Sequence, residues 1–267
     1  MFEIPEDRLP PGFAETVSDP PARPAVPRPA ATIVPLRDGA DGIEALLMRR
    51  QRSSGFVPGA WVFPGGRVDP ADSGPSLYER IDGLPSDPRP NAAFWTAALR
   101  ELFEETGVLL ARDAAGNWSP DASSDGRLEA LRRSLMNGTA ALMDVLDELD
   151  ARLEASGVVR LAHWVTPVVE PRRYDTHFFA AALPESRAVK PDPREMTEAA
   201  WLAPAEALAR FERSELPMVF PTVKTLEALR GYDSVEHALT SLRHRAVPRI
   251  LPRLVRTGTG VAIVIDD

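Results

Sequence analysis

The sequence predicts an α/β fold, because strand-like apolar runs alternate with segments that have helical spacing. The first two runs, at residues 31–36 and 43–49, are separated by a turn signal rich in Asp and Gly, which is typical of a hairpin. Asn91 is a candidate N-cap for a helix that runs to Thr106, and Gly107 suits the left-handed position that ends such a helix. Together these features predict a mixture of strands and helices.

The other elements follow in chain order. Residues 1–30 contain many prolines and predict an extended N-terminal arm, ahead of one large domain at residues 31–267. The run Trp61-Val62-Phe63 predicts a strand that leads into a Gly-Gly turn. Later strands are expected at 163–169, 174–181, 201–202 and 261–265, and later helices from Pro204, at 222–229 and at 234–243.

Two segments differ from this alternation. Residues 69–91 are rich in Pro, Gly, Asp and Ser, which is the composition of a loop. Residues 124–156 instead carry leucine and valine at helical spacing, and Asn137-Gly138 divides them into two helices. We expect these helices to pack on the core as a small cap.

Composition restricts the class of protein. The chain is 44% hydrophobic and 26% charged, which is ordinary for a soluble globular protein. Its net charge of -8 argues against nucleic acid as a partner, and the absence of cysteine excludes disulfides, thiolate zinc sites and cysteine nucleophiles. No apolar run approaches the ~18 residues that span a bilayer, and the N-terminus lacks a signal-peptide pattern. We therefore expect a cytoplasmic protein that does not enter the membrane.

Three carboxylates are expected on one side of the helix that ends at Thr106. Glu101, Glu104 and Glu105 stand at positions i, i+3 and i+4, so their side chains converge and repel each other unless a cation lies between them. Such all-oxygen sites suit hard cations such as Mg²⁺ or Mn²⁺. The same spacing also occurs on solvent-exposed acidic faces. Gly65-Gly66 upstream favours the metal site, because two glycines permit φ > 0 and a close approach of backbone to a metal-bound phosphate.

These residues resemble the signature of the Nudix hydrolase superfamily, G-x5-E-x7-R-E-U-x-E-E-x-G-U with U aliphatic. Residues 100–108 match its second half without a gap, and residues 63–66 are the F-P-G-G run that often precedes it. The first half departs from the signature: its glutamate position holds Asp72 when counted from Gly66 and Ala92 when counted from the helix. The resemblance therefore implies a Nudix-type α/β/α sandwich with a mixed sheet, with a loop insertion at 69–91 and a helical insertion at 124–156.

The resemblance also implies roles for individual residues in metal-dependent hydrolysis of a pyrophosphate bond. Arg100 would hold a glutamate of the helix by a salt bridge, and Glu101 would also orient or deprotonate the attacking water. A general base would come from a loop outside the signature, with Glu198 as the first candidate and Glu195 and Glu170 as alternatives. The implied metal ligands are Glu101, Glu104, Glu105 and the carbonyl of Gly65.

Within the superfamily, the runs at 163–167 and 171–179 resemble the peroxisomal coenzyme A diphosphatase branch. This likeness implies that coenzyme A or acyl-coenzyme A is cleaved to adenosine 3′,5′-bisphosphate and phosphopantetheine, with Mg²⁺ or Mn²⁺ as cofactor. The arginine of the wider coenzyme A motif is replaced by Gly55, so the nearby Arg50, with Arg49 and Arg52 as alternatives, is a candidate to bind a substrate phosphate in its place. Arg172 and Arg173 are further candidates, and they are equally expected as surface arginines that pair with nearby carboxylates.

Other functions stay open at this point. A Nudix enzyme of this kind could instead cleave ADP-ribose, NADH or dinucleoside polyphosphates, although residues 109–125 lack the run that marks the NADH branch. A non-catalytic Nudix module that senses a ligand is a third reading, but such domains usually lose glutamates that this helix retains. The substrate is in each case a small nucleotide derivative, and a homodimer is one expectation. His163 and His177 are expected to be structural.

Overall fold

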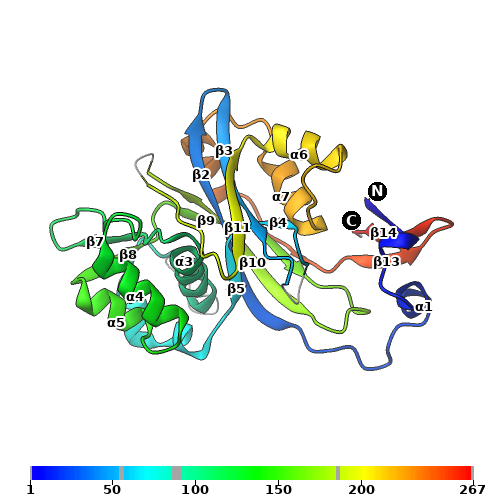
Figure 1. The fold of residues 1–267 in the computed structure, drawn as a ribbon, viewed down its shortest axis with the longest axis horizontal. Helices are drawn as coiled ribbons and strands as arrows, with labels where there is room; N and C mark the ends of the chain where they lie inside the picture. Colours follow the sequence, from blue (N-terminus) through cyan, green and yellow to red (C-terminus); the bar gives the residue numbers. More distant parts are fainter. Residues whose placement is uncertain (1, 54–56, 86–91, 185–186, 266–267) are drawn as a thin grey trace.

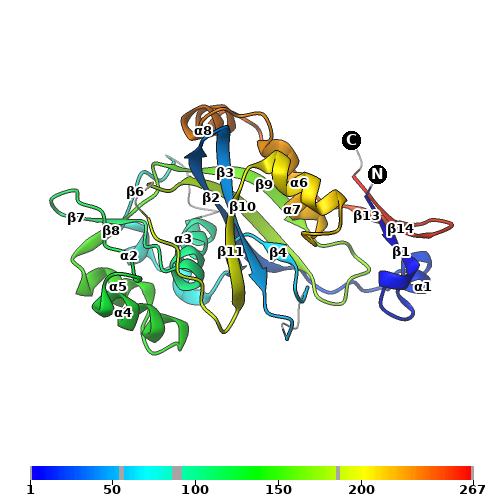
Figure 2. The same ribbon diagram turned by 45° about the horizontal axis from the view of Figure 1, so that its top comes forward.

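A mixed β-sheet lies between two layers of helices (Figure 1). The computed structural model describes residues 2–53, 57–85, 92–184 and 187–265. On one face of the sheet lies α3, and α6, α7 and α8 cover the other face (Figures 1 and 2). This is the three-layer α/β/α architecture that the sequence predicts.

The described residues form the following elements. The strands are β1 (Phe2–Pro5), β2 (Arg28–Gly39), β3 (Gly42–Arg50), β4 (Trp61–Val62), β5 (Gly65–Arg67), β6 (Ile81–Asp82), β7 (Ala111–Asp113), β8 (Ala151–Glu154), β9 (Val158–Val165), β10 (Tyr174–Ala182), β11 (Met196–Leu202), β12 (Arg249–Ile250), β13 (Arg253–Arg256) and β14 (Gly260–Val264). The helices are α1 (Phe13–Ser18), α2 (Pro75–Tyr78), α3 (Ala92–Thr106), α4 (Gly126–Met136), α5 (Leu142–Glu148), α6 (Pro204–Glu212), α7 (Phe220–Leu229) and α8 (Val235–Arg243), with 3-10 helices η1 (Glu6–Arg8) and η2 (Pro70–Ser73).

The large sheet has the strand order β11-β3-β2-β10-β9-β12, with β4 beside β3 and β5 beside β2. The predicted hairpin is present, because β2 and β3 pair antiparallel with Asp38 opposite Ile43. Its neighbour β10 runs parallel to β2, whereas β9 and β10 are antiparallel. The sheet is therefore mixed, as expected.

Alternate residues of the central strands pack in two separate hydrophobic cores. Ile33 of β2 and Phe179 of β10 pack in the core that contains α3, while Val34 and Phe178 pack with α7 and α8 on the opposite face. This follows from the two-residue period of a strand, which sends successive side chains to opposite faces. Both cores are apolar, so the sheet is buried on both sides and holds α3 firmly in place.

Helix α3 is buried on most of its circumference because a second lobe covers the side away from the sheet. That lobe contains α4, α5 and a small sheet of order β6-β8-β7, and it lies beside α3 in Figure 1. The predicted C-cap is confirmed, because Gly107 has φ 76° and donates its N–H to the carbonyl of Phe103. The candidate N-cap Asn91 lies outside the described residues.

The two insertions contain more strand than their sequences predict. The expected pair of helices between residues 124 and 156 is present as α4 and α5, but the end of this segment is strand β8. Leu149 and Leu153 are four residues apart and therefore look helical in the sequence. However, Asp150 between them has φ 45°, which ends the helical segment. In the segment 69–91, the described part forms η2, α2 and β6.

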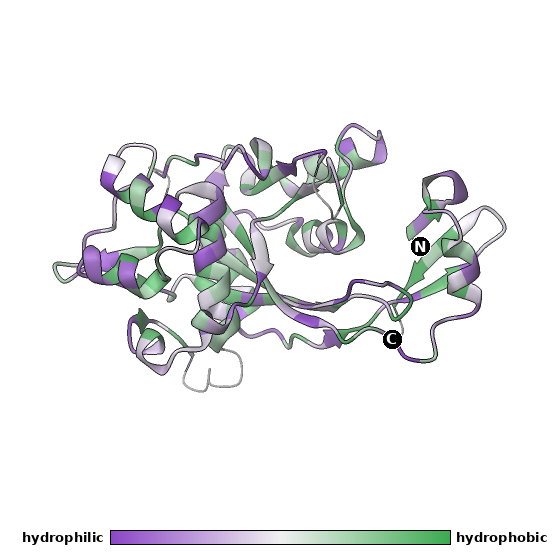
Figure 3. Cartoon of the chain, turned by 60° about the horizontal axis from the view of Figure 1, so that its bottom comes forward, coloured by the Kyte–Doolittle hydropathy of each residue, from purple (hydrophilic) through white to green (hydrophobic). Residues whose placement is uncertain are grey.

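The chain ends pair with each other in a small sheet of order β1-β14-β13, in which Phe2 is opposite Ile263. Figure 3 shows this sheet at one end of the molecule, joined to the sandwich by extended segments. The prediction of an extended arm is therefore wrong for residues 2–18, which form β1, η1 and α1. The strand expected at 163–169 ends at Val165. Among the described residues, no helix has the length and apolar character needed to cross a bilayer.

Candidate active site

The C-terminal half of α3 carries a set of glutamates that are largely buried. Glu105 is 2% exposed and Glu101 is 9% exposed, while Glu104 lies nearer the surface. Burial of several carboxylates so close together is costly unless a cation or a hydrogen-bond network compensates their charge. The surroundings of these three residues therefore indicate what the site can bind.

The two glycines after β4 bring backbone directly against these carboxylates. The N–H of Gly65 donates to Oε2 of Glu105 at 3.2 Å. A Cβ atom on Gly66 would lie 2.3 Å from Oε1 of Glu101, and one on Gly65 would lie 2.6 Å from the carbonyl oxygen of Ala31. Neither glycine has a positive φ; both belong to β5, which pairs with β2. The prediction of a close backbone approach is thus confirmed, and neither glycine uses the positive φ that its missing side chain permits.

Arg100 holds the carboxylates of α3 in place. Its Nη1 donates to Glu101 at 2.9 Å and to Glu104 at 3.1 Å. Its other nitrogens, Nε and Nη2, each lie 3.0 Å from an oxygen of Asp72, and Nη2 also donates to the carbonyl of Arg67. Burial alone would lower the pKa of Arg100, but these hydrogen bonds and carboxylate charges raise it, so the guanidinium stays charged.

Asp72 occupies the place where the Nudix signature has its first glutamate, and its side chain is 1% exposed. Besides binding Arg100, it accepts the N–H of Asp69 at 2.8 Å and so closes a capping box on η2. The aspartate therefore joins the insertion after Gly66 to α3 through Arg100.

The pKa values of the helix glutamates are all raised. Burial raises the pKa of Glu101 to about 7, with Arg100 opposing this and Glu104 and Glu195 adding to it. Burial, followed by the charges of Glu101 and Glu195, raises the pKa of Glu105 well above its usual range. Burial also raises the pKa of Glu104, and Arg100 partly offsets this. Ionisation of all three carboxylates is therefore unfavourable in these surroundings without a further cation.

A pocket of about 230 Å³ opens beside these residues and is lined by Glu104, Glu105, Met136, Arg194 and Glu195. Glu195 lies in the loop before β11, far along the chain from α3. Its charge influences both Glu101 and Glu105, so it belongs electrostatically to the same cluster. Arg50 at the end of β3 lowers the pKa of Glu105, and thus a cationic side chain also lies within reach.

The loop that carries Glu195 is fixed to the C-terminal end of α3. The N–H of Lys190 donates to the backbone carbonyl of Thr106 at 2.7 Å, and the N–H of Asp192 donates to the backbone carbonyl of Glu105 at 3.1 Å. The last carbonyls of a helix have no partner within the helix, so these bonds satisfy groups that would otherwise be unpaired. On the other side, the carbonyl of Glu195 accepts the N–H of Gln51 at 2.9 Å.

The helical insertion also borders the pocket. Met136 at the end of α4 lines it, and Asn137 accepts a hydrogen bond from Arg194 at 3.0 Å. Within α4, the buried side chain of Arg132 donates to the carbonyls of Glu104 and Lys190 at 2.9 and 3.0 Å. The cap thus supports both α3 and the loop of Glu195. The sequence offered no signal for Arg132 beyond a charged residue within a leucine pattern.

Several predicted site residues lie elsewhere or have other partners. Glu198 is half-exposed on β11, where it forms an ion pair with Arg49 at 2.7 Å. Arg173 is buried and donates to the carbonyls of Thr166 and Ala25, so it fastens the N-terminal segment to β10. Arg172 is exposed just before β10, and Glu170 is half-buried with a pKa raised by burial. The stated partners of Glu198 and Arg173 all lie outside α3.

The donor set at α3 fits a hard divalent cation. Glu101, Glu104, Glu105 and Glu195 offer only oxygen atoms, which is the ligand type that Mg²⁺ and Mn²⁺ prefer. Burial is the main cause of their raised pKa values, and a cation bound beside them would favour the ionised carboxylates. The pocket beside them could hold phosphate oxygens that complete the coordination.

Comparisons with known proteins agree with this arrangement. The family model of the NUDT19 Nudix domain matches residues 79–229. Acyl-coenzyme A diphosphatase NUDT19 of Homo sapiens is 28% identical over 278 residues, covering 88% of this chain and 74% of that protein. The Xenopus laevis protein of the same name is 27% identical, covering 65% of this chain and 56% of its own length. A crystal structure of a NUDIX hydrolase from Alicyclobacillus acidocaldarius has a TM-score of 0.72 and 32% identity, covering 83% of this chain and 99% of that chain.

Proposed function

This chain belongs to the Nudix hydrolase family, and from that membership we propose that it cleaves the pyrophosphate bond of coenzyme A or acyl-coenzyme A with the help of Mg²⁺ or Mn²⁺. The products would be adenosine 3′,5′-bisphosphate and a phosphopantetheine species. The observation that carries the proposal is the buried glutamate cluster of α3, with the backbone of Gly65 and Gly66 against it and a pocket beside it.

Residues of this chain divide into those that would hold the metal and those that position them. Glu101, Glu104 and Glu105 would be ligands, together with the carbonyl of Gly65. Arg100 orients two of the glutamates, and the N–H of Gly65 orients the third. A divalent cation bound there would neutralise phosphate oxygens and make a water molecule more acidic.

For the general base, the structure favours Glu195 over Glu198. Glu195 lines the pocket beside Glu105, so its carboxylate could accept a proton from a water molecule in that pocket. Glu198 instead forms an ion pair with Arg49 and is not among the residues that line this pocket. We therefore propose Glu195 as the base and a structural role for Glu198.

Support for coenzyme A as substrate comes from the curated relatives, which are named acyl-coenzyme A diphosphatases. It also comes from the cations near the cluster. Arg194 lines the pocket and Arg50 influences Glu105, so both are suitable to bind phosphate groups of a substrate. Gly55, where the coenzyme A motif has an arginine, lies outside the described residues, so Arg50 and Arg194 are the proposed replacements.

The test is product analysis with purified protein and Mg²⁺ or Mn²⁺. The panel is coenzyme A, acetyl- and longer acyl-coenzyme A, ADP-ribose, NADH and diadenosine polyphosphates. Metal-dependent release of adenosine 3′,5′-bisphosphate, fastest from coenzyme A species, is the expected result. Preference for another panel member would retain the pyrophosphatase chemistry and remove the coenzyme A assignment. No turnover of any member would favour the non-catalytic sensing module.

A further inference from the structure

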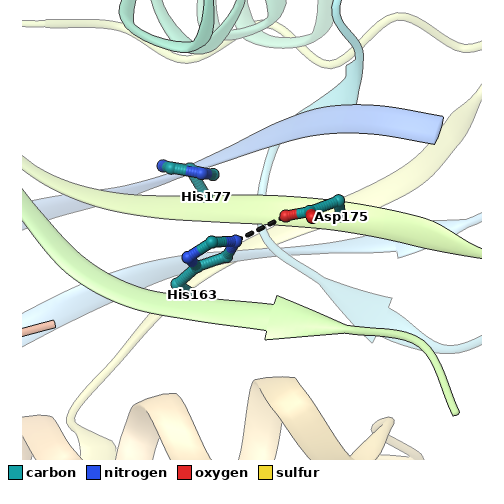
Figure 4. Close-up of side chains that lie close together, drawn as sticks. All are labelled: His163, Asp175 and His177. Atoms are coloured by element: carbon teal, nitrogen blue, oxygen red, sulfur yellow. Dashed lines mark hydrogen bonds and ion pairs between the residues drawn. The ribbon is translucent and has the colours of Figure 1, made fainter. Parts of the chain in front are cut away.

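A second cluster of potential metal ligands lies on the sheet, apart from the glutamates of α3. His163 of β9 and Asp175 and His177 of β10 place one potential ligand atom each within 4.8 Å of the others. Figure 4 shows the three side chains together on neighbouring strands, with Nε2 of His163 hydrogen-bonded to Oδ1 of Asp175. In the part of the chain that the structure describes, no other group of three such residues is this close.

The strand register explains why these three residues meet. His163 is directly opposite His177 in the antiparallel pair of β9 and β10. Asp175 is two residues before His177, so both project from the same face of β10. Side chains opposite each other on one face lie close enough to share a ligand. The cluster is therefore built into the sheet and does not depend on a loop.

His177 is the residue that points to a ligand. It is 5% exposed, and its Nδ1 has no hydrogen-bond partner among the described residues. Its ring stacks on that of Phe94 from α3 and contacts the tilted ring of His163, with centroids 4.0 Å apart in each case. A buried polar nitrogen without a partner costs free energy, of the order of 1–3 kcal/mol. A bound metal ion would remove this cost by accepting the nitrogen lone pair.

We propose that His163, Asp175 and His177 form a second metal site, which binds a divalent transition-metal ion such as Zn²⁺. Two imidazoles and a carboxylate are a donor set that suits such ions, whereas the oxygen-only cluster on α3 suits Mg²⁺ or Mn²⁺. Three protein ligands leave a further coordination position for water or another small ligand. The two sites differ in the chemistry of their ligands and can be tested separately.

The two sites are also separated in space. Phe94, which covers His177, lies in the first turn of α3, whereas the glutamates occupy residues 101–105 of the same helix. At a rise of about 1.5 Å per residue, this corresponds to roughly 10–16 Å along the helix axis. A Zn²⁺ ion bound at the histidines would therefore share no protein ligand with the proposed catalytic metal.

Charged neighbours modulate the site without blocking it. Arg249 approaches Oδ2 of Asp175 at 3.4 Å, which leaves Oδ1 directed at His163. Burial lowers the pKa of His177 to about 4, with the charges of His163 and Arg160 adding to this and Asp175 opposing it. The arginines reduce the affinity for any cation, so the ligand atoms must supply most of the binding.

The proposal is tested by measuring Zn²⁺ binding to the full chain, without a histidine tag and stripped of metal. Millimolar Mg²⁺ is present throughout to occupy the glutamate cluster. We expect one equivalent of Zn²⁺ by equilibrium dialysis, and an absorption spectrum typical of four or five ligands when Co²⁺ replaces it. His177→Gln and Asp175→Asn should each weaken Zn²⁺ affinity about tenfold or more. Loss of a group that only hydrogen-bonds to a metal ligand already costs about that much affinity, and loss of a direct ligand should cost at least as much.

The exposed pair His237 and Asp233 provides a matched control, because it has one imidazole and one carboxylate at 2.8 Å but no third ligand. His237→Gln should leave the Zn²⁺ stoichiometry and the Co²⁺ spectrum unchanged. Circular dichroism checks that each variant is folded. If His177→Gln does not fold, a rise of the wild-type melting temperature on addition of Zn²⁺, abolished by Asp175→Asn, gives the same information. Zn²⁺ binding that Glu105→Gln removes, or that His177→Gln leaves intact, would overturn the proposal, as would no binding at all.

Discussion

Asp72 and Arg100 form a bidentate ion pair that is almost completely withdrawn from solvent, with both carboxylate oxygens 3.0 Å from guanidinium nitrogens. Removal of Asp72 takes two hydrogen bonds from the buried guanidinium, while Glu101 and Glu104 still balance its charge, so we expect a cost of about 1–3 kcal/mol. Asp72→Ala should therefore lower the melting temperature and also weaken activity, because Arg100 loses its orientation. Asp147→Ala removes the partner of Arg80 from an exposed ion pair and should change stability by less than ~1 kcal/mol. Equal effects of the two variants in thermal unfolding would contradict the assigned role of Asp72.

A substitution in the glutamate cluster should lower activity without unfolding the protein. Glu105→Gln keeps the size of a buried side chain and removes its charge, so the fold should persist. The turnover number should fall about 100-fold or more, because the proposed metal site loses a ligand. Steady-state kinetics combined with a Mg²⁺ titration measures both effects. A variant with near-wild-type turnover would show that Glu105 does not hold the metal.

Glu195 and Glu198 allow a direct test of the proposed base. Glu195→Gln should reduce the turnover number about 100-fold or more, since general acid–base catalysis contributes roughly 10²–10⁴ in rate. Glu198→Gln should have little effect on turnover, because the side chain is half-exposed and paired with Arg49. The readout is the pH dependence of kcat/KM for both variants. A larger loss of turnover in Glu198→Gln than in Glu195→Gln would assign the role of base to Glu198.

Gly66 should tolerate no side chain. A Cβ atom would lie 2.3 Å from Oε1 of Glu101, so Gly66→Ala must displace that carboxylate. We expect a loss of turnover and of Mg²⁺ affinity of about tenfold or more, by analogy with loss of groups that orient metal ligands. Gly126→Ala is the control, since nothing lies within 4 Å of its added Cβ. Unchanged Mg²⁺ affinity in Gly66→Ala would mean that Glu101 is not a ligand.

Stability in the absence of metal should fall as pH rises. The pKa of Glu101 is raised to about 7 in the folded protein, against a usual value of 4.5, so between these values the folded state binds more protons than the unfolded state. The free energy of unfolding then decreases with increasing pH. Mg²⁺ should therefore raise the melting temperature more at pH 8 than at pH 5.5, where protons compete for the carboxylates. Differential scanning fluorimetry in EDTA and in Mg²⁺ measures this, and an equal rise at both pH values would refute it.

The local motif predicted α3 well, because its glutamate spacing, its C-cap glycine and the preceding glycine pair are all contained in a short stretch of sequence. The position of Glu195 beside α3 could not be predicted from a local motif. It depends on the pairing of β11 with β3 and on the docking of its loop to the end of α3, which joins residues far apart in the chain. Spacing alone could not choose between Glu195 and Glu198.

Departures from the sequence-based expectation have equally specific causes. Leu153 continues a helical spacing, but the backbone of Asp150 turns the chain into β8. Arg173 has the charge needed to bind phosphate, yet the carbonyls of Thr166 and Ala25 use its donors. In each case a partner distant in sequence, or one backbone conformation, overrides a correct local pattern.

The pairing of β1 with β14 has a consequence for biosynthesis. Phe2 and Ile263 are partners in one ladder, so β1 cannot pair with β14 until the residues between the two strands have been synthesised. At roughly 5–20 residues per second, this delay is on the order of tens of seconds. Throughout that time the sandwich can fold while β1 keeps an unpaired edge, which is the kind of surface that chaperones bind and that mispairs with other nascent chains. The ladder of β1 and β14 therefore forms only after the strands of the sandwich, which lie between them in the chain, have been synthesised.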